Sequence, residues 1–334
     1  MDSPYARELT VAIGALQKAA QLSQSIVSSQ DKGVIEKEDL SPVTVADFAV
    51  QALLTATIKN AFPEDNVVGE EDASDLRKNS VLMERVWELL SRVAGDEDTP
   101  SLCQLPATRE QMCDLIDECG ASSPGASGRT WVFDPIDGTK TYLRGELYAI
   151  NMALLLDGEQ VAGIVGAPNL SIDAKAPLRN ENIDTTGKGC IFFAIKGHGA
   201  FIRPLNLDEP RRLSTHATGQ DLPLASMPLT RAATSVPWVL RWAALAMGLG
   251  NTTVWVYKRR DRYAKAWDHA GAMLLFEEAG GKITDVLGKK IDLTAGRKMS
   301  ANFGFVAAPE DIHGKVLQTV HGVLQEQGKQ SFLE

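Results

Sequence analysis

Apolar residues along this chain either recur at helical spacing or form short continuous runs, and these two patterns predict the helices and strands of the fold. Residues 5–30 follow a helical period, with Leu9, Ile13 and Leu16 on one face. A second helical face covers residues 41–62, where Ser41-Pro42 is a plausible start signal. A short apolar run at 67–68 then predicts a strand, which ends in three consecutive acids.

The middle of the chain, residues 74–128, is the least informative part of the pattern. Two helical patterns, VLMERVWELLSRV and REQMCDLIDECG, are joined by the polar link at 95–101. The flexible sequence SSPGASGR closes this stretch. We interpret 74–128 as an insertion that could form a lid over a site.

Strands and helices alternate through the second half of the chain, which predicts an α/β protein built from layers. Turn residues separate the runs, as at Asp157-Gly158 and at Gly197-His198-Gly199, and Gly280-Gly281 ends a helix. The region 204–235 is polar and poorly patterned. The pattern predicts strands at 131–133, 148–156, 161–167, 190–196, 200–203, 252–257, 282–285 and 303–307, and helices at 236–247, 266–279 and 310–325.

The chain length and the composition indicate a globular protein of two packed halves. The 334 residues exceed the length at which one core stops growing, so we expect halves at 1–168 and 169–334. Apolar residues make up 44% and charged residues 23%, which is ordinary for a globular protein. The net charge of −9 argues against a nucleic-acid-binding protein, which would present a basic face. If the substrate is an anion, metal ions are the obvious source of local positive charge.

The cysteines and the apolar runs indicate a cytoplasmic protein. Cys103, Cys113, Cys119 and Cys190 show no zinc-site spacing, and a disulfide framework is not expected in so long a chain. No run resembles a signal peptide, and none approaches the length of a membrane span. We therefore expect no membrane partner.

The stretch 131–139, WVFDPIDGT, carries the clearest chemical signal. An apolar strand leads into Asp134 and Asp137, and Gly138-Thr139 follow as a turn. Pro135 has a fixed φ angle and no amide hydrogen, so we expect the strand to end there. Two carboxylates on a rigid strand end, beside backbone amides, suit a hard divalent cation and a phosphate group. A turn with two solvated acids is the alternative.

Three further acids lie at the ends of predicted elements. Glu70 opens the acidic run after the strand at 67–68, which is either a solvated loop or the source of one metal-binding carboxylate. Asp47 and Asp268 each lie near the beginning of a predicted helix, where the helix dipole favours an acid. Spacing alone favours this dipole role for Asp47 and leaves it open for Asp268.

Taken together, four blocks of sequence resemble the inositol monophosphatase superfamily of metal-dependent, lithium-sensitive phosphatases. The blocks are SPVTVADFAVQ, VVGEED, DPIDGT and AWDHAGAMLLFEEAGG, and their order and separation match over most of the chain. Within the superfamily, DGTKTYLRGELYAINMAL, FPED and GAPNL resemble the 3′(2′),5′-bisphosphate nucleotidase branch. The resemblance implies a fold in which helices and sheets alternate as α-β-α-β-α layers.

The resemblance also implies Mg²⁺ as cofactor, with two or three ions. Glu70, Asp134 and the backbone carbonyl of Ile136 would hold one ion, and Asp134, Asp137 and Asp268 would hold a second. Oxygen ligands and a bridging carboxylate suit a pair of Mg²⁺ ions, which stabilises the attacking and the leaving oxygen of a phosphoryl transfer.

The remaining implied roles concern the proton and the substrate. Asp47 and the hydroxyl of Thr139 would form a dyad that takes a proton from the attacking water, and the amides of Gly138 and Thr139 would bind phosphate oxygens. Members of the nucleotidase branch remove the 3′-phosphate from adenosine 3′,5′-bisphosphate, and many act on its sulfated form. The implied partner is therefore a small phosphorylated molecule.

The chain departs from the nucleotidase branch around the substrate. Trp238, Arg241 and Trp255 occupy the places of a Ser-x-x-Lys pair and a later Arg. We predict that Arg241 and Trp255 bind substrate, although a buried core position is the simpler explanation for a Trp. The basic run 258–262 is either a solvated loop or faces an anionic substrate. An inositol- or sugar-phosphate phosphatase and a non-catalytic sensor of a phosphorylated ligand remain the alternatives. The sequence gives no indication of the oligomeric state.

Overall fold

The computed structural model describes residues 4–27, 35–36, 42–94, 103–207, 209–214 and 236–334. The predicted link at 95–101 and most of the region 204–235 lie outside these residues. In the described part of the chain, no helix is both long enough and apolar enough to cross a membrane.

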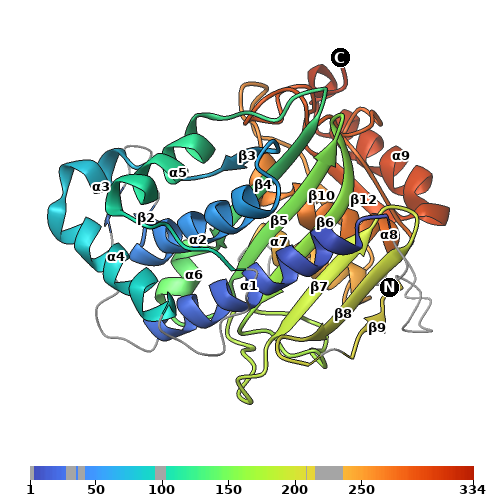
Figure 1. The fold of residues 1–334 in the computed structure, drawn as a ribbon. Coiled ribbons are helices and arrows are strands. Elements are labelled where there is room, and N and C mark those ends of the chain that lie inside the picture. The colour runs from blue at the N-terminus through green and yellow to red at the C-terminus, as the bar shows by residue number, and fades with distance from the viewer. Residues whose placement is uncertain (1–3, 28–34, 37–41, 95–102, 208, 215–235) are drawn as a thin grey trace.

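A seven-stranded mixed sheet occupies the centre of the molecule (Figure 1). Its strands lie in sequence order, β3 runs parallel to β4, and every other pair of neighbours is antiparallel. The strands are β3 Asn66–Gly69, β4 Arg129–Asp137, β5 Ala149–Leu156, β6 Glu159–Ala167, β7 Cys190–Ile195, β8 Gly199–Pro204 and β9 Arg211–Arg212. A separate antiparallel sheet has the order β10-β12-β11, with β10 Thr253–Trp255, β11 Gly281–Thr284 and β12 Phe305–Pro309.

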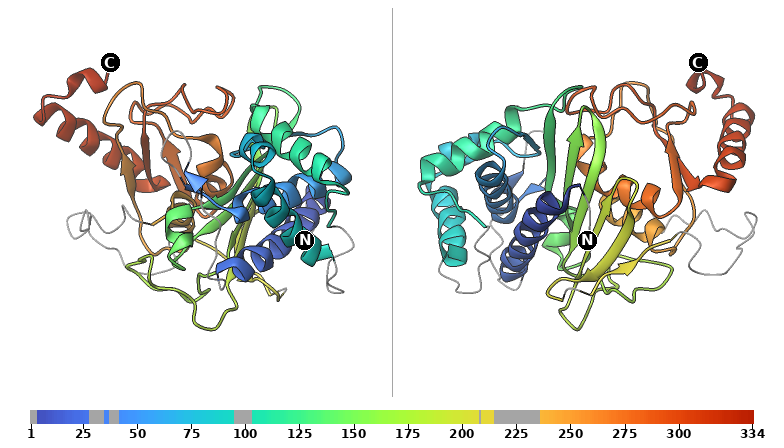
Figure 2. Two further views of the ribbon diagram at one scale, coloured as in Figure 1. Left: turned by 90° about the vertical axis from the view of Figure 1, so that its left-hand side faces the viewer. Right: turned by 45° about the vertical axis from the view of Figure 1, so that its right-hand side comes forward.

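Helices cover both faces of the central sheet, and the helices and the two sheets together form five layers (Figure 2). α1 and α2 pack on one face, and α4 and α5 pack on α2. α8 packs on the other face together with α7, the small sheet follows, and α9 covers its outer side. This α-β-α-β-α order confirms the predicted layered α/β fold. The helices are α1 Ala6–Val27, α2 Val45–Ala61, α3 Ser74–Lys78, α4 Ser80–Ala94, α5 Arg109–Ala121, α6 Thr139–Leu143, α7 Trp238–Ala246, α8 Ala270–Glu278 and α9 Glu310–Glu326, with short 3₁₀ turns η3 Ala266–Asp268 and η4 Gln330–Phe332.

The two faces of the central sheet belong to two separate apolar cores. On β4, Trp131 and Phe133 pack with α1 and α2, whereas Val132 packs with α7 and α8. This alternation follows from the two-residue period of a strand. Because both faces are covered, the strand is apolar at every one of these positions. The expected division of the chain into halves at 168/169 stays a prediction. The central sheet continues across this point, since β6 pairs with β7.

The prediction that the strand ends at Pro135 is wrong. β4 continues to Asp137, with Asp134 opposite Asn151 and Asp137 opposite Ala149. The register shifts between these two pairs, so β4 holds one more residue there than β5. Such a bulge leaves a residue without its ladder hydrogen bond, which accommodates a proline inside the sheet.

Two predicted helix beginnings also differ from the structure. α2 begins at Val45 and not at Ser41-Pro42, because Pro42–Val43 (β2) pairs with Ile35–Glu36 (β1). The predicted helix at 266–279 is divided into η3 and α8 by His269, whose backbone is not helical. Asp268 therefore lies at the end of a 3₁₀ turn and not in the first turn of an α-helix.

Two glycines allow α8 to lie directly on the central sheet. A Cβ atom at Gly271 would lie 2.2 Å from the carbonyl oxygen of Met152, and one at Gly163 would lie 2.2 Å from the carbonyl oxygen of Gly271. Only a residue without a side chain permits this approach at either position. The crossing places η3, at the beginning of α8, against β4 and β5.

Candidate active site

The irregular end of β4 presents Asp134 and Asp137 in a largely buried setting. Asp134 is 1% exposed, and its Oδ1 atom is buried without a hydrogen-bond partner. Asp137 Oδ2 accepts a hydrogen bond of 2.6 Å from the amide of Val239. This bond joins the end of β4 to the first turn of α7, whose free amides favour a negative charge.

Burial dominates the ionisation of Asp137. It raises the pKa of this carboxyl to about 7, although the amides of Val239 and Trp238 and the charge of Arg241 act in the opposite direction. A group that remains partly protonated near neutral pH despite these favourable contacts lies in a strongly anionic and poorly solvated place. A cation bound there would stabilise the ionised carboxylate and so oppose the shift.

The structure brings the other predicted acids to the same place. Glu70 follows β3, the parallel neighbour of β4, and Asp268 ends η3 beside β4. Burial, and then the charge of Glu70, raise the pKa of Asp134 well above its ordinary value, with smaller effects from Asp137, Asp268 and Asp47. Burial, Asp137 and Glu70 raise the pKa of Asp268 in the same way, while its interaction with the Asp134 carboxyl acts in the opposite direction. Five acids from four separate stretches of the chain thus interact electrostatically.

These residues fit a hard divalent cation by their chemistry. The donors are carboxylate oxygens, one of which, Asp134 Oδ1, is buried without a partner. Within the described ranges, no group of three or more His, Cys, Asp or Glu side chains is arranged closely enough to hold a metal ion as it stands. The carboxyl groups are therefore close enough to repel one another without enclosing an ion between them.

Asp47 has a structural role that its sequence position indicated. Its Oδ2 atom accepts hydrogen bonds of 2.7 Å from both the amide and the hydroxyl of Thr44. The hydroxyl of Thr44 in turn accepts a hydrogen bond from the amide of Asp47, so the two residues form a capping box at the beginning of α2.

The hydroxyl of Thr139, the other member of the predicted dyad, donates to the carbonyl oxygen of Ile136 at 3.3 Å. The dyad of Asp47 and Thr139 stays a prediction.

Gly138 is required where it stands. Its φ angle is +90°, and a Cβ atom there would lie 2.4 Å from Pro237 Cγ and 2.7 Å from Thr141 Oγ1. The turn between β4 and α6 therefore packs directly against the residue that precedes α7. Phosphate binding by the amides of Gly138 and Thr139 stays a prediction.

Trp238, Arg241 and Trp255 form an aromatic and cationic wall beside the acids. The rings of Trp238 and Trp255 stack with centroids 4.5 Å apart, and the Arg241 guanidinium lies 4.2 Å from the Trp238 ring centroid. All three side chains are half-buried. Arg241 interacts electrostatically with Asp137, which places this wall next to the end of β4.

The basic run 258–262 is mostly occupied by contacts of its own. Arg259 pairs with Asp261, and Arg260 donates to the carbonyl oxygen of Ser331 and lies over Phe303. Arg262 lies 5.8 Å from the Trp255 ring centroid, at the edge of the wall.

The sequence analysis missed two buried polar residues near the acids. Gln51 is fully buried one helical turn after Asp47. Its side-chain amide donates to the carbonyl oxygen of Glu71 and accepts from the backbone amide of the same residue. The position of Gln51 among the apolar residues of the predicted helix at 41–62 could have indicated this role. His269 accepts a hydrogen bond from the Trp242 indole, and burial lowers the pKa of its imidazole to about 3. Its position directly after Asp268 gave no separate signal.

Comparison with known proteins places these features in a family. A sequence model of the inositol monophosphatase family matches residues 5–325. The 3′(2′),5′-bisphosphate nucleotidase of Emericella nidulans is 36% identical over 96% of this chain and 99% of its own length. The enzyme of the same name from Schizosaccharomyces pombe is 34% identical over 95% of both chains. Among solved structures, an inositol monophosphatase of Thermotoga maritima has the same fold, with a TM-score of 0.57 and 19% identity over 96% of this chain and 99% of its own.

Proposed function

Because this chain belongs to the inositol monophosphatase family, we propose that it is a Mg²⁺-dependent phosphatase that removes the 3′-phosphate of adenosine 3′,5′-bisphosphate. The sulfated form of this nucleotide is proposed as a second substrate. The names of relatives that are 30–36% identical over nearly the whole chain support the choice of substrate. The observation that carries the chemistry is the cluster of two buried acids, Asp134 and Asp137, and two half-buried acids, Asp268 and Glu70, whose mutual repulsion calls for a cation.

The proposed ligands divide between two ions, with a third ion left open. Glu70, Asp134 and the Ile136 carbonyl would hold one Mg²⁺, and Asp134, Asp137 and Asp268 would hold the other. When bound, such ions supply Lewis acidity toward the phosphate and lower the pKa of a coordinated water. The protein's own part is to hold the carboxylates at the end of β4, after β3 and at the end of η3, where they interact with one another.

The proton of the attacking water would pass to the dyad of Asp47 and Thr139. Asp47 is held at the beginning of α2 by Thr44, which orients its carboxylate. In the proposed dyad this carboxylate would act as general base through the hydroxyl of Thr139, which in the structure donates to the carbonyl oxygen of Ile136. The amides of Gly138 and Thr139 would bind phosphate oxygens.

Arg241 and Trp255 are the proposed contacts to the rest of the substrate. Arg241 carries a positive charge beside Asp137, which suits a second phosphate. Trp238 and Trp255 are stacked on each other, so a base would contact their exposed edges or displace one ring.

This stacking favours a second candidate, an inositol- or sugar-phosphate phosphatase, because such substrates need no aromatic face. The third candidate, a non-catalytic sensor, is less well supported, since every acid expected in the family is present, together with Thr139.

A phosphate-release panel tests these alternatives. Purified protein would be given adenosine 3′,5′-bisphosphate, its sulfated form, inositol 1-phosphate or fructose 1,6-bisphosphate with Mg²⁺, with excess chelator, and with Mg²⁺ plus Li⁺. We expect the highest kcat/KM on the nucleotide, loss of activity in chelator, and inhibition by Li⁺, with Asp134→Asn as the inactive control. Preference for an inositol or sugar phosphate would replace the proposed substrate. The absence of phosphate release from every substrate, despite binding, would favour the sensor.

A further inference from the structure

Arg297 joins two backbone segments that lie far apart in the sequence and carry proposed metal ligands. Its Nη2 atom donates to the carbonyl oxygens of Gly69 at 2.7 Å and of Glu70 at 3.3 Å. Its own carbonyl oxygen accepts the amide of Ala266 at 3.1 Å, at the beginning of the turn that ends in Asp268. One residue therefore holds the backbone of Glu70 and also supports the turn of Asp268.

The Arg297 guanidinium is held on further sides. Its Nη1 atom donates to the carbonyl oxygens of Cys119 at 3.0 Å and Ser122 at 3.1 Å, at the end of α5. Its Cζ atom lies 4.6 Å from the ring centroid of Trp267, the residue before Asp268. A planar group that donates in several directions and stacks on an aromatic ring needs Arg, because Lys has neither the fork nor the plane.

Gln51 holds the same loop from the side of α2. Its Nε2 atom donates to the Glu71 carbonyl oxygen at 2.7 Å, and its Oε1 atom accepts the Glu71 amide at 2.9 Å. A Cβ atom at Gly69 would lie 2.6 Å from this Oε1 atom, so the loop passes directly over Gln51. The backbone on both sides of Glu70 is thus bound by buried or half-buried side chains.

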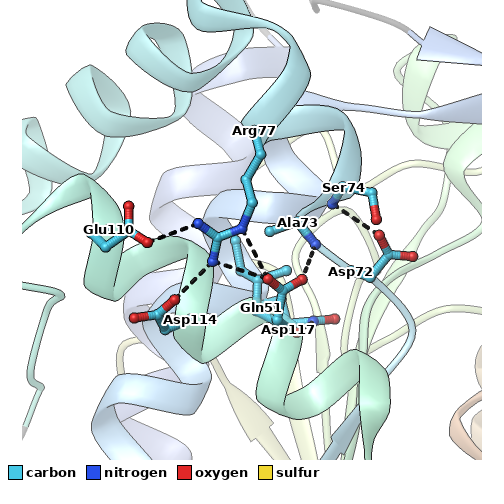
Figure 3. Close-up of polar contacts among 9 residues, drawn as sticks. Gln51, Asp72, Ala73, Ser74, Arg77, Glu110, Asp114 and Asp117 are labelled. Carbon is cyan, nitrogen blue, oxygen red and sulfur yellow. Dashed lines mark hydrogen bonds and ion pairs between the residues drawn. The ribbon is translucent and has the colours of Figure 1, made fainter.

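The chain after the loop is anchored separately (Figure 3). Asp117 accepts the amide of Ala73 at 2.7 Å and also pairs with Arg77. Arg77 forms further ion pairs with Glu110 and Asp114, which tie α3 to α5 on the exposed surface. Arg77 is therefore a suitable control for Arg297. Both are arginines near the Glu70 loop, but Arg77 binds side chains of α5, whereas Arg297 binds the backbone of Gly69 and Glu70.

We propose that Arg297 is a positioning residue that sets the spacing between the Glu70 loop and the Asp268 turn, so that both carboxylates can bind the same cation pair. The hydrogen bonds described above end on neutral carbonyl groups, and the guanidinium also interacts electrostatically with Glu70. The inference rests on the proposed function, since it takes Glu70 and Asp268 as ligands. A tie that served stability alone would leave cation affinity unchanged.

Direct binding of Mg²⁺ without substrate tests the proposal. Calorimetric titrations would compare wild-type protein with Arg297→Met, Arg297→Lys and the control Arg77→Met. Loss of a residue that orients metal ligands weakens metal binding by about 10- to 100-fold, and we expect this loss in Arg297→Met. Arg297→Lys should fall between Arg297→Met and wild type, and Arg77→Met should match wild type.

Two further measurements separate positioning from stability. Hydrogen exchange should become faster in Arg297→Met in both 69–72 and 265–269, because this residue hydrogen-bonds to both segments. In the activity assay, the half-saturating Mg²⁺ concentration should rise by the same factor as the binding constant, while kcat at saturating Mg²⁺ stays within about threefold of wild type. Unchanged Mg²⁺ affinity in Arg297→Met would overturn the proposal, whether or not exchange at 265–269 becomes faster.

Outcomes for this inference and for the proposed function remain distinguishable. If the wild-type protein binds Mg²⁺ but releases no phosphate, the proposed activity fails and the Arg297 comparison still stands. If Arg297→Met does not fold, Arg297→Lys decides by the same titration and exchange measurements. Wild-type affinity and exchange in Arg297→Lys would then contradict the role given to the guanidinium fork.

Discussion

At the scale of single residues, Asp47 combines a structural contact with a proposed chemical one. Its carboxylate closes the capping box with Thr44, which satisfies free amides at the beginning of α2. Its charge also contributes to the raised pKa of Asp134, so the group lies near the metal ligands proposed here. We therefore expect removal of the charge to affect helix stability through the capping box and catalysis through the proposed general base.

Asp47→Asn should lower kcat by about 10²- to 10⁴-fold with little change in KM, because it removes the general base and keeps an oxygen that can accept from Thr44. The measurement is steady-state phosphate release over a range of Mg²⁺ concentrations. Asp134→Asn is the comparison, and it should also raise the Mg²⁺ requirement, since it removes a ligand shared by both ions. Rescue of Asp47→Asn by high Mg²⁺ would show that Asp47 is a ligand and not the base.

At the scale of elements, the crossing of α8 over β5 and β6 decides where Asp268 stands. Gly163 and Gly271 let the backbones of helix and sheet meet without a side chain between them. η3 lies directly before α8, so its position relative to β4 depends on this close packing. A small displacement of α8 would move Asp268 away from Asp134.

Gly271→Ala should destabilise the protein by about 1–3 kcal/mol or more, because its Cβ atom would lie 2.2 Å from the Met152 carbonyl oxygen and force α8 outward. Denaturant or thermal unfolding measures the loss. Gly314→Ala is the matched control, since Gly314 is an exposed position within α9 where a Cβ atom meets nothing. That change should stabilise by roughly 0.5–1 kcal/mol through helix propensity. Equal effects of the two substitutions would show that the crossing is not tightly packed.

At the scale of the whole molecule, the carboxylate cluster couples stability to pH and to cations. Burial raises the pKa of Asp137 to about 7 and also raises those of Asp134 and Asp268. Acids with a raised pKa in the folded state favour folding while they are protonated. Their contribution is complete below the ordinary pKa and is lost as the pH rises through the folded value.

In the presence of chelator, the melting temperature should therefore fall as the pH rises from about 5 to about 8 and these groups ionise. A change of one pKa unit corresponds to about 1.4 kcal/mol of unfolding free energy. Mg²⁺ binds the ionised carboxylates, so its stabilisation should be larger at pH 8 than at pH 5.5. At a concentration of about 100 times Kd it should approach ~2.7 kcal/mol. Thermal scans with and without Mg²⁺ at both pH values measure this, and Asp137→Asn should reduce the pH dependence. A shift by Mg²⁺ of equal size at both pH values would contradict the carboxylate cluster as the binding site.

Local patterns in the sequence were sufficient for the elements and for the acids at their ends. The apolar runs of β5 and β6 and the helical period of α1 and α9 depend on neighbouring residues, so they could be predicted without the fold. DPIDGT likewise indicated a rigid turn with two carboxylates, whatever its surroundings. The resemblance of four blocks to one family then implied the layered fold that the structure has.

Only the tertiary structure decided how these parts meet. Pro135 remains inside β4 because a bulge opposite β5 removes the need for its amide, and a bulge depends on the partner strand. Trp238 and Trp255 stack on each other because α7 and β10 come together, which no periodicity records. Arg297 lies more than two hundred positions from Glu70, and its role depends on carbonyl groups that any residue could present. Sequence patterns report the face that a residue occupies, whereas its partners across the molecule follow only from packing.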